Sequence, residues 1–121
     1  MTDAKTLRHA DLRQFTGSER WYRHPLARKM LYTDGAQYVA EHGGAYWLLD
    51  AIAFAQAIPA VAAEEFQLWK LEVRPDRAAT LACEDGNGKR VHRQEIPFTD
   101  FPLDEIKLYF TDGVILLPDE Y

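Results

Sequence analysis

The order of hydrophobic and polar positions divides the chain into a helical first half and a strand-rich second half. Residues 45–58 are apolar on nearly every side, which predicts a central helix, covered on most sides, that stops at Pro59. Two shorter helices are expected before it, from Thr6 to Phe15 and from Gly35 to Glu41, each followed by a glycine stop signal. The first 63 residues are therefore predicted to be mainly helical.

From residue 64 onward, apolar residues recur at every second position in short runs, which is typical of strands. These runs include Phe66–Val73, Ala79–Cys83, Val91–Ile96, Leu108–Phe110 and Val114–Leu117. Turn residues at Asp85–Gly88 and Asp112–Gly113 predict hairpins between neighbouring runs. The sequence thus predicts one α+β domain over residues 1–121, with a helical part of about 1–63 and a sheet part of about 64–121. N-terminal helices would pack on one face of a four- or five-stranded antiparallel meander sheet.

The segment from residue 20 to residue 29 mixes basic and aromatic side chains, and we call it the basic-aromatic segment. Pro25 prevents a regular helix here, so a loop or edge segment is expected, leading into a short strand near Met30–Thr33. Its composition suits a surface for nucleic acid or an acidic partner. The alternative, which we favour, is that Trp21 and Tyr22 fill the core while the arginines meet the acidic sheet.

Charge is distributed unevenly along a chain whose composition is otherwise that of an ordinary globular protein. The net charge is −5, with 47% hydrophobic and 27% charged residues. Residues 1–30 hold seven Lys/Arg against three Asp/Glu, whereas residues 31–121 hold seven against sixteen. The single Cys83 cannot form an internal disulfide, and no export signal or membrane-spanning stretch is apparent. We therefore expect a cytoplasmic protein without membrane association.

Asp50 is the most unusual residue, because it is the only charged side chain between Ala45 and Ala63. A carboxylate in a largely buried helix needs a partner or a raised pKa. We favour a structural ion pair with an arginine of the basic-aromatic segment, either Arg20, Arg23 or Arg28. In that case Asp50 anchors the irregular N-terminal segment to the central helix.

A functional interpretation of the same carboxylate stays open. Tyr46 lies one helical turn before Asp50, and His24 and Glu19 belong to the segment expected nearby. A desolvated carboxylate and an imidazole in one pocket are typical of acid–base catalysis or of a site for a ligand cation. This interpretation predicts a small-ligand site or an enzyme centred on Asp50.

Other motifs that carry chemistry are missing from the sequence. The histidines lack the spacing of a metal site, and the lone Cys83 has no metal-ligand neighbour in sequence. Ser18 lacks a nucleophile elbow, and the glycines near residue 87 have the length of a hairpin rather than a phosphate-binding loop. We expect no metal and no cofactor, and the absence of a catalytic constellation makes an enzyme the less favoured class.

Four strings of the sequence resemble an uncharacterised bacterial family, a domain of unknown function met near plasmids, phages and integrated elements. They are residues 15–19 (FTGSE), 22–25 (YRHP), 32–35 (YTDG) and 45–50 (AYWLLD). The resemblance implies an accessory protein of mobile DNA, such as a host-interaction or defence-inhibition factor, and brings no catalytic residues with it. Trp47 and Asp50 both belong to these strings.

Our leading hypothesis is a small non-enzymatic binding protein with a protein partner. The two rivals are the Asp50-centred ligand site or enzyme, and a nucleic-acid-binding protein that uses the basic-aromatic segment. Exposed edge strands in a small sheet also make a dimer plausible. The candidate contact residues are Glu19, Arg20, Tyr22, Arg23, His24, Arg28, Tyr46, Trp47 and Asp50.

Overall fold

The computed structural model describes residues 7–16 and 20–121, and Glu19, Thr6 and Gly17 lie outside these ranges. Four short α-helices, seven strands and one 3-10 turn occur within the described residues. In chain order they are α1 (His9–Leu12), β1 (Trp21–Arg23), β2 (Leu31–Thr33), α2 (Asp34–Gly43), α3 (Tyr46–Ala55), α4 (Pro59–Ala62), β3 (Phe66–Val73), β4 (Ala79–Glu84), β5 (Arg90–Ile96), β6 (Glu105–Thr111), β7 (Val114–Leu116) and η1 (Pro118–Glu120).

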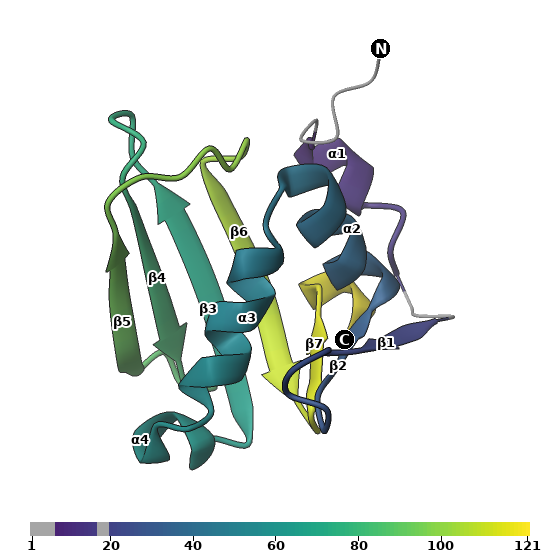
Figure 1. Cartoon of the computed structure of the whole chain (residues 1–121), viewed down its shortest axis with the longest axis vertical. Helices are drawn as coiled ribbons and strands as arrows, with labels where there is room; N and C mark the ends of the chain where they lie inside the picture. The colour runs from purple at the N-terminus through teal and green to yellow at the C-terminus, as the bar shows by residue number, and fades with distance from the viewer. Residues whose placement is uncertain (1–6, 17–19) are drawn as a thin grey trace.

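The strands form one mixed sheet in the order β1-β2-β7-β6-β3-β4-β5. Every neighbouring pair is antiparallel except β2 and β7, which run parallel. The expected antiparallel meander of four or five strands is therefore wrong. Strands β3 to β7 follow the predicted runs, and both predicted hairpins occur, but β1 and β2 extend the sheet beyond β7 (Figure 1).

The two strands that the sequence did not place in the sheet are each three residues long. Such a segment is too short to show a period of two, and Pro25 lies between them in the connecting loop. The parallel pairing joins Leu31 to Val114, far apart in the chain, and no local pattern encodes such a contact. The error therefore arose from a long-range pairing of short strands.

The helices begin and end at residues that satisfy the free backbone groups. Thr33 is the N-cap of α2, and its hydroxyl accepts a hydrogen bond from the backbone N–H of Ala36 at 3.2 Å. Gly44 ends α2 in the left-handed conformation, with φ of 61°. The helix expected to run as far as residue 58 ends at Ala55 instead, and α4 then begins at Pro59.

Helix α3 crosses in front of β3 and β6, and α2 lies beside β2 and β7 (Figure 1). One side of α3 is buried in the core through Leu48, Leu49 and Ile52. The prediction that this helix is covered on most sides is only partly right. An outer stripe at four-residue spacing, starting at Tyr46 and reaching Ile58 just beyond the helix, remains open to solvent.

The C-terminal end of the chain is held against the start of α2 by a carboxylate, and we call this contact the Glu120 clamp. The Thr33 hydroxyl donates to Glu120 Oε1 at 2.6 Å, and the backbone N–H of Gly35 donates to Oε2 at 3.1 Å. The N–H of Leu117 donates to Oε1 at 2.8 Å. A carboxylate is favourable at a helix N-terminus, so the clamp stabilises α2 and fixes the last turn of the described chain.

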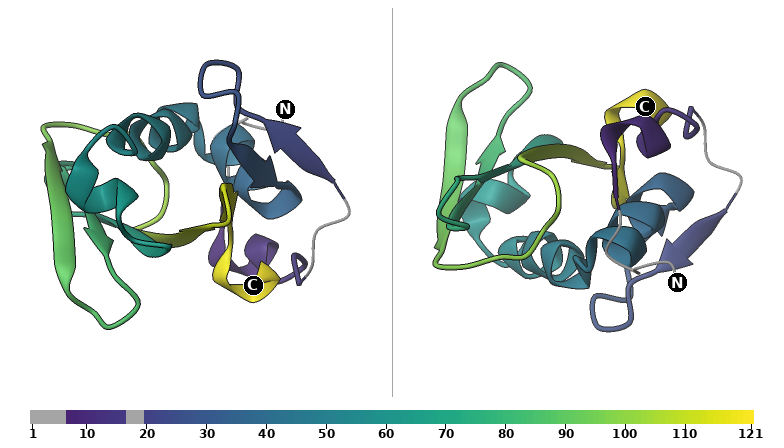
Figure 2. Two further views of the ribbon diagram at one scale, coloured as in Figure 1. Left: turned by 90° about the horizontal axis from the view of Figure 1, so that it is seen from below. Right: turned by 90° about the horizontal axis from the view of Figure 1, so that it is seen from above.

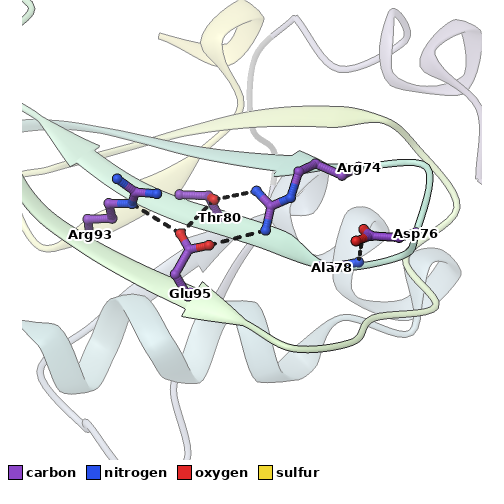
Figure 3. Close-up of polar contacts among 6 residues, drawn as sticks. All are labelled: Arg74, Asp76, Ala78, Thr80, Arg93 and Glu95. Carbon is purple, nitrogen blue, oxygen red and sulfur yellow. Dashed lines mark hydrogen bonds and ion pairs between the residues drawn. The ribbon is translucent and has the colours of Figure 1, made fainter.

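Helix α3 lies on one side of β3 to β5 (Figure 2), and the opposite face of these strands carries charged side chains. Figure 3 shows Glu95 accepting from the Thr80 hydroxyl at 2.7 Å, from Arg93 at 3.0 Å and from Arg74 at 3.1 Å. The hydrogen bonds from Thr80 and Arg93 lower the pKa of Glu95. Glu95 thus forms ion pairs with both Arg74 and Arg93 on this face.

Candidate functional site

The hairpin β1–β2 meets α3 around Asp50. In both views of Figure 2 the loop of this hairpin lies next to α3. His24 follows β1 directly, its side chain is 2% exposed, and its Nε2 lies 2.8 Å from Asp50 Oδ1. The Asp50 side chain is 45% exposed, so the expectation of a buried carboxylate is wrong. The outward stripe of α3 places Asp50 at the boundary between the core and solvent.

The hydrogen bonds of His24 fix its tautomer. Its Nδ1 accepts from the backbone N–H of Leu26 at 3.1 Å and from that of Ala27 at 2.9 Å. A nitrogen that accepts two hydrogen bonds carries no proton, so the proton is on Nε2, which donates to Asp50. The imidazole is neutral in this arrangement, and Asp50 therefore keeps its negative charge uncompensated by His24.

Tyr32 lies close enough to Asp50 to interact with it electrostatically, Tyr22 stacks on Tyr32, and Tyr46 precedes Asp50 by one helical turn. Tyr22 and Tyr32 are opposite each other in the β1–β2 pair, and their stacked rings have centroids 5.5 Å apart. Burial is the main cause that raises the pKa of Tyr32, and the nearby Tyr22 and Asp50 raise it further. The pKa of Tyr46 is also raised, first by burial, then by its hydrogen bond to Glu41 at 3.0 Å. Tyr32 and Tyr46 are thus neutral phenols at neutral pH.

We call Tyr22, Tyr32, Tyr46 and Asp50, with His24 beneath them, the Asp50 cluster. Of these residues, the sequence had singled out all but Tyr32. The stacked ring of Tyr22 could have pointed to Tyr32 only once the strand register was known, because the two residues are paired across a hairpin whose turn contains Pro25. The cluster therefore depends on the β1–β2 pairing that sequence patterns did not reveal.

Apolar side chains continue the exposed stripe beyond the cluster. Phe54 is 55% exposed, Ile58 is 36% exposed, and Leu26 in the hairpin loop is 70% exposed. The Phe54 ring meets the His24 ring edge-on at 6.3 Å, which joins the loop to the helix stripe. A groove of about 320 Å³ lies between this stripe and the edge strand β5, where His92 and Gln94 line it. We call the patch of Leu26, Tyr46, Asp50, Phe54 and Ile58 the α3 surface.

The predicted arginines lie elsewhere. Arg20, Arg23 and Arg28 are all exposed, and the Arg23 guanidinium donates to the backbone carbonyl of Arg28. In the part of the chain that the structure describes, none of them lies within ion-pair distance of Asp50, whose partner is His24. The favoured structural pairing of Asp50 with an arginine is therefore replaced by a pairing with a histidine, although both anchor the N-terminal segment to α3.

The tryptophans of the candidate region differ in burial. Trp47 is partly buried against the core, so it serves packing more than contact. Trp21, which the favoured interpretation had placed in the core, is 59% exposed. It alternates with Tyr22 along β1, and the two rings therefore point to opposite faces of the strand. Glu19, the remaining candidate, lies outside the described residues.

The geometry leaves His24 and Cys83 poorly suited to acid–base or nucleophilic chemistry. Both ring nitrogens of His24 are already in hydrogen bonds, so neither is available to a substrate. Burial raises the pKa of the Cys83 thiol to about 12, with neighbouring carboxylates adding to the effect, which makes it a poor nucleophile. No group of three or more potential metal ligands occurs within residues 7–16 and 20–121.

A second groove, of about 310 Å³, lies between α1 and β6. Both signs of charge line it, through Arg13 and Lys107 and through Glu105 and Asp119. Such a mixed lining does not select an anion or a cation. The α3 surface remains the region where an exposed carboxylate and exposed aromatic residues meet.

Fold and site together define a small mixed α+β protein with an exposed aromatic–carboxylate patch. The chain belongs to a family of unknown function, DUF6876, whose family model matches residues 6–121. No curated protein matches the chain, and no solved structure matches it. Within the described residues, no helix has the length and apolar character needed to cross a membrane.

Proposed function

We propose that this protein is a small non-enzymatic binding protein that docks a protein partner on the α3 surface. The observation that carries the proposal is the exposed stripe Tyr46, Asp50, Phe54 and Ile58, which the hairpin loop extends through Leu26. Large apolar side chains gathered around a rigid helix, with polar groups at their margin, are typical of protein-binding patches.

The energetics favour a macromolecular partner. Each large apolar side chain of the stripe contributes roughly 1.5–3 kcal/mol when it is fully removed from water. Aromatic residues also dominate the energetic centres of interfaces, and Tyr46 and Phe54 supply two of them on one helix face. The secondary structure beneath them is fixed by the core, so binding orders few groups.

The test is affinity capture with matched variants. The wild type is compared with Phe54→Glu, on the α3 surface, and with Phe98→Glu, on the β5–β6 connection. Phe98 is 68% exposed, so both variants place a charge at a solvent-exposed ring without touching the core. Quantitative mass spectrometry should find a set of proteins bound by the wild type and Phe98→Glu but lost with Phe54→Glu. Equal capture by all three proteins would contradict the proposal.

The biological setting that we propose follows from the sequence resemblance. The protein would act in the bacterial cytoplasm as an accessory factor of mobile DNA, where its partner would be a host or defence protein. Its single, buried, free cysteine suits a reducing compartment. Capture from a bacterial host lysate, with and without a mobile element, is the experiment that tests this setting.

Exposure of Trp21 favours a second candidate function, nucleic-acid binding through the basic-aromatic segment. Its indole is 59% exposed, and Arg20, Arg23 and Arg28 of the same segment are exposed as well. A base can stack on such a ring while the guanidinium groups meet phosphates. Fluorescence anisotropy with a labelled single-stranded oligonucleotide should then show binding that weakens steeply with salt and with Trp21→Ala. Salt-independent binding, or none, would eliminate this candidate.

A further inference from the structure

We propose that the Asp50 cluster recognises a lysine or arginine side chain of the protein partner. This inference rests on the proposed function, because the cluster is the polar end of the α3 surface. It assigns a specific chemistry to that surface: the partner's cation would meet the Asp50 carboxylate and the tyrosine rings, while its neighbouring apolar residues would cover Phe54 and Leu26.

The first argument is the unbalanced charge of Asp50. His24 donates one hydrogen bond to Oδ1 but is neutral, and no cation of the described residues pairs with the carboxylate. A side chain that is 45% exposed leaves its second oxygen accessible to an incoming group. A carboxylate with apolar and aromatic neighbours is solvated less well than one in open water, and this strengthens its attraction to a partner's cation.

The second argument is the arrangement of the aromatic rings. Tyr32 interacts electrostatically with Asp50, Tyr22 stacks on the Tyr32 ring, and Tyr46 precedes Asp50 by one helical turn. The negative faces of tyrosine rings attract ammonium and guanidinium groups. Glu41, which accepts a hydrogen bond from the Tyr46 hydroxyl, adds a second carboxylate at the margin of the cluster. Arg23 does not oppose a cation here, since it alternates with Tyr22 and points to the other face of β1.

Charge also argues against a second copy of this chain as the occupant. If two α3 surfaces met about a twofold axis through the middle of the helix, the two Asp50 carboxylates would face each other, and like charges disfavour such a contact. A free small amine is also a poor occupant, because it would leave Phe54 and Leu26 exposed. A cationic side chain within an apolar segment satisfies both parts of the surface.

Asp50→Asn is the decisive variant, because it removes the charge and keeps the hydrogen bond. The amide oxygen of asparagine can accept from His24 Nε2 as the carboxylate does, so the hairpin stays anchored. Thermal unfolding of Asp50→Asn should therefore match the wild type closely. Any loss of binding by this variant then reports on charge and not on folding.

The probe is a phage-displayed library of random peptides, selected on the wild-type protein. We expect selected peptides that share a lysine or arginine flanked by apolar residues. Fluorescence polarisation should show roughly tenfold weaker binding to Asp50→Asn, which corresponds to about 1.4 kcal/mol. Replacing the peptide's basic residue with norleucine should weaken its binding to the wild type by a similar factor. The same replacement should change the affinity for Asp50→Asn little, since the two changes remove one and the same interaction.

The outcomes separate this inference from the proposed function. Peptides that lack a shared basic residue, or that bind Asp50→Asn within twofold of the wild type, would overturn the cation site. If such peptides still lose binding to Phe54→Glu and not to Phe98→Glu, the α3 surface is supported as a docking site but the cation site is rejected. Peptides that bind all variants equally, or a selection that yields no binder, would count against both.

Discussion

His24→Ala is expected to be the most damaging single change in the candidate site. The imidazole is buried, and its 2.8 Å hydrogen bond to Asp50 links the hairpin to α3. Its other two hydrogen bonds, from the N–H groups of Leu26 and Ala27 at 3.1 and 2.9 Å, hold the loop of the hairpin. Alanine leaves two backbone N–H groups and one carboxylate oxygen without this partner, and each lost bond costs about 1 kcal/mol or more. Allowing for relaxation of the loop, we expect a loss of about 3 kcal/mol in the free energy of unfolding.

Thermal unfolding followed by circular dichroism measures this loss. For a chain of this length, 3 kcal/mol corresponds to a fall in Tm of about 12 °C. Asp50→Ala, which leaves only the buried Nε2–H of His24 without an acceptor, should lower the free energy of unfolding by about 1 to 2 kcal/mol. Asp50→Asn should lower it by less than about 0.5 kcal/mol. His9→Ala, at an exposed position of α1, is the control and should leave Tm unchanged. If His24→Ala unfolds within about 2 °C of the wild type, the anchoring role assigned to His24 is wrong.

Three further predictions concern other parts of the fold. Cys83 should resist a thiol reagent until the protein unfolds, because it is buried and its pKa is raised to about 12; labelling at the rate of a free thiol would contradict this. Gly35→Ala should lower Tm clearly, since the new Cβ would lie 2.5 Å from a Glu120 carboxylate oxygen. Gly86→Ala is the control: its Cβ would have its nearest neighbour at 3.7 Å, so Tm should stay unchanged. The pKa of Glu95 is lowered in the folded state, so its contribution to stability is present above the ordinary glutamate pKa and is lost as pH falls through the folded-state value. The stability of Glu95→Gln, measured by denaturation across the acid range, should lack this loss.

Elements with a clear local pattern could be predicted from the sequence. The alternation of β3 and β4 and the turn residues at Asp85–Gly88 and Asp112–Gly113 gave the central strands and their hairpins. The boundaries of α3 were less accurate, because its apolar pattern continues past Ala55 into the turn before Pro59. The short strand expected near Met30–Thr33 occurs as β2, but its parallel contact with β7 was beyond reach, since that contact depends on residues about eighty positions away.

The candidate site was predicted in part, for a physical reason. A lone carboxylate in an apolar helix stands out in a sequence, so Asp50 was found, and its need for a partner in the N-terminal segment was a sound expectation. The identity of that partner was not predicted correctly, because charge alone favours arginine. The arginine side chains stay in solvent, whereas the shorter imidazole fits in the core and satisfies two loop amides as well.

A purely structural role does not require the charge of Asp50. Its one hydrogen bond within the described protein comes from a neutral imidazole, and a neutral acceptor such as asparagine would serve the same purpose. The carboxylate is 45% exposed and interacts electrostatically with Tyr32, and no cation of the described chain pairs with it. The feature that this hydrogen bond leaves unexplained is therefore the negative charge itself, which is the feature that the proposed recognition of a partner's cation would use.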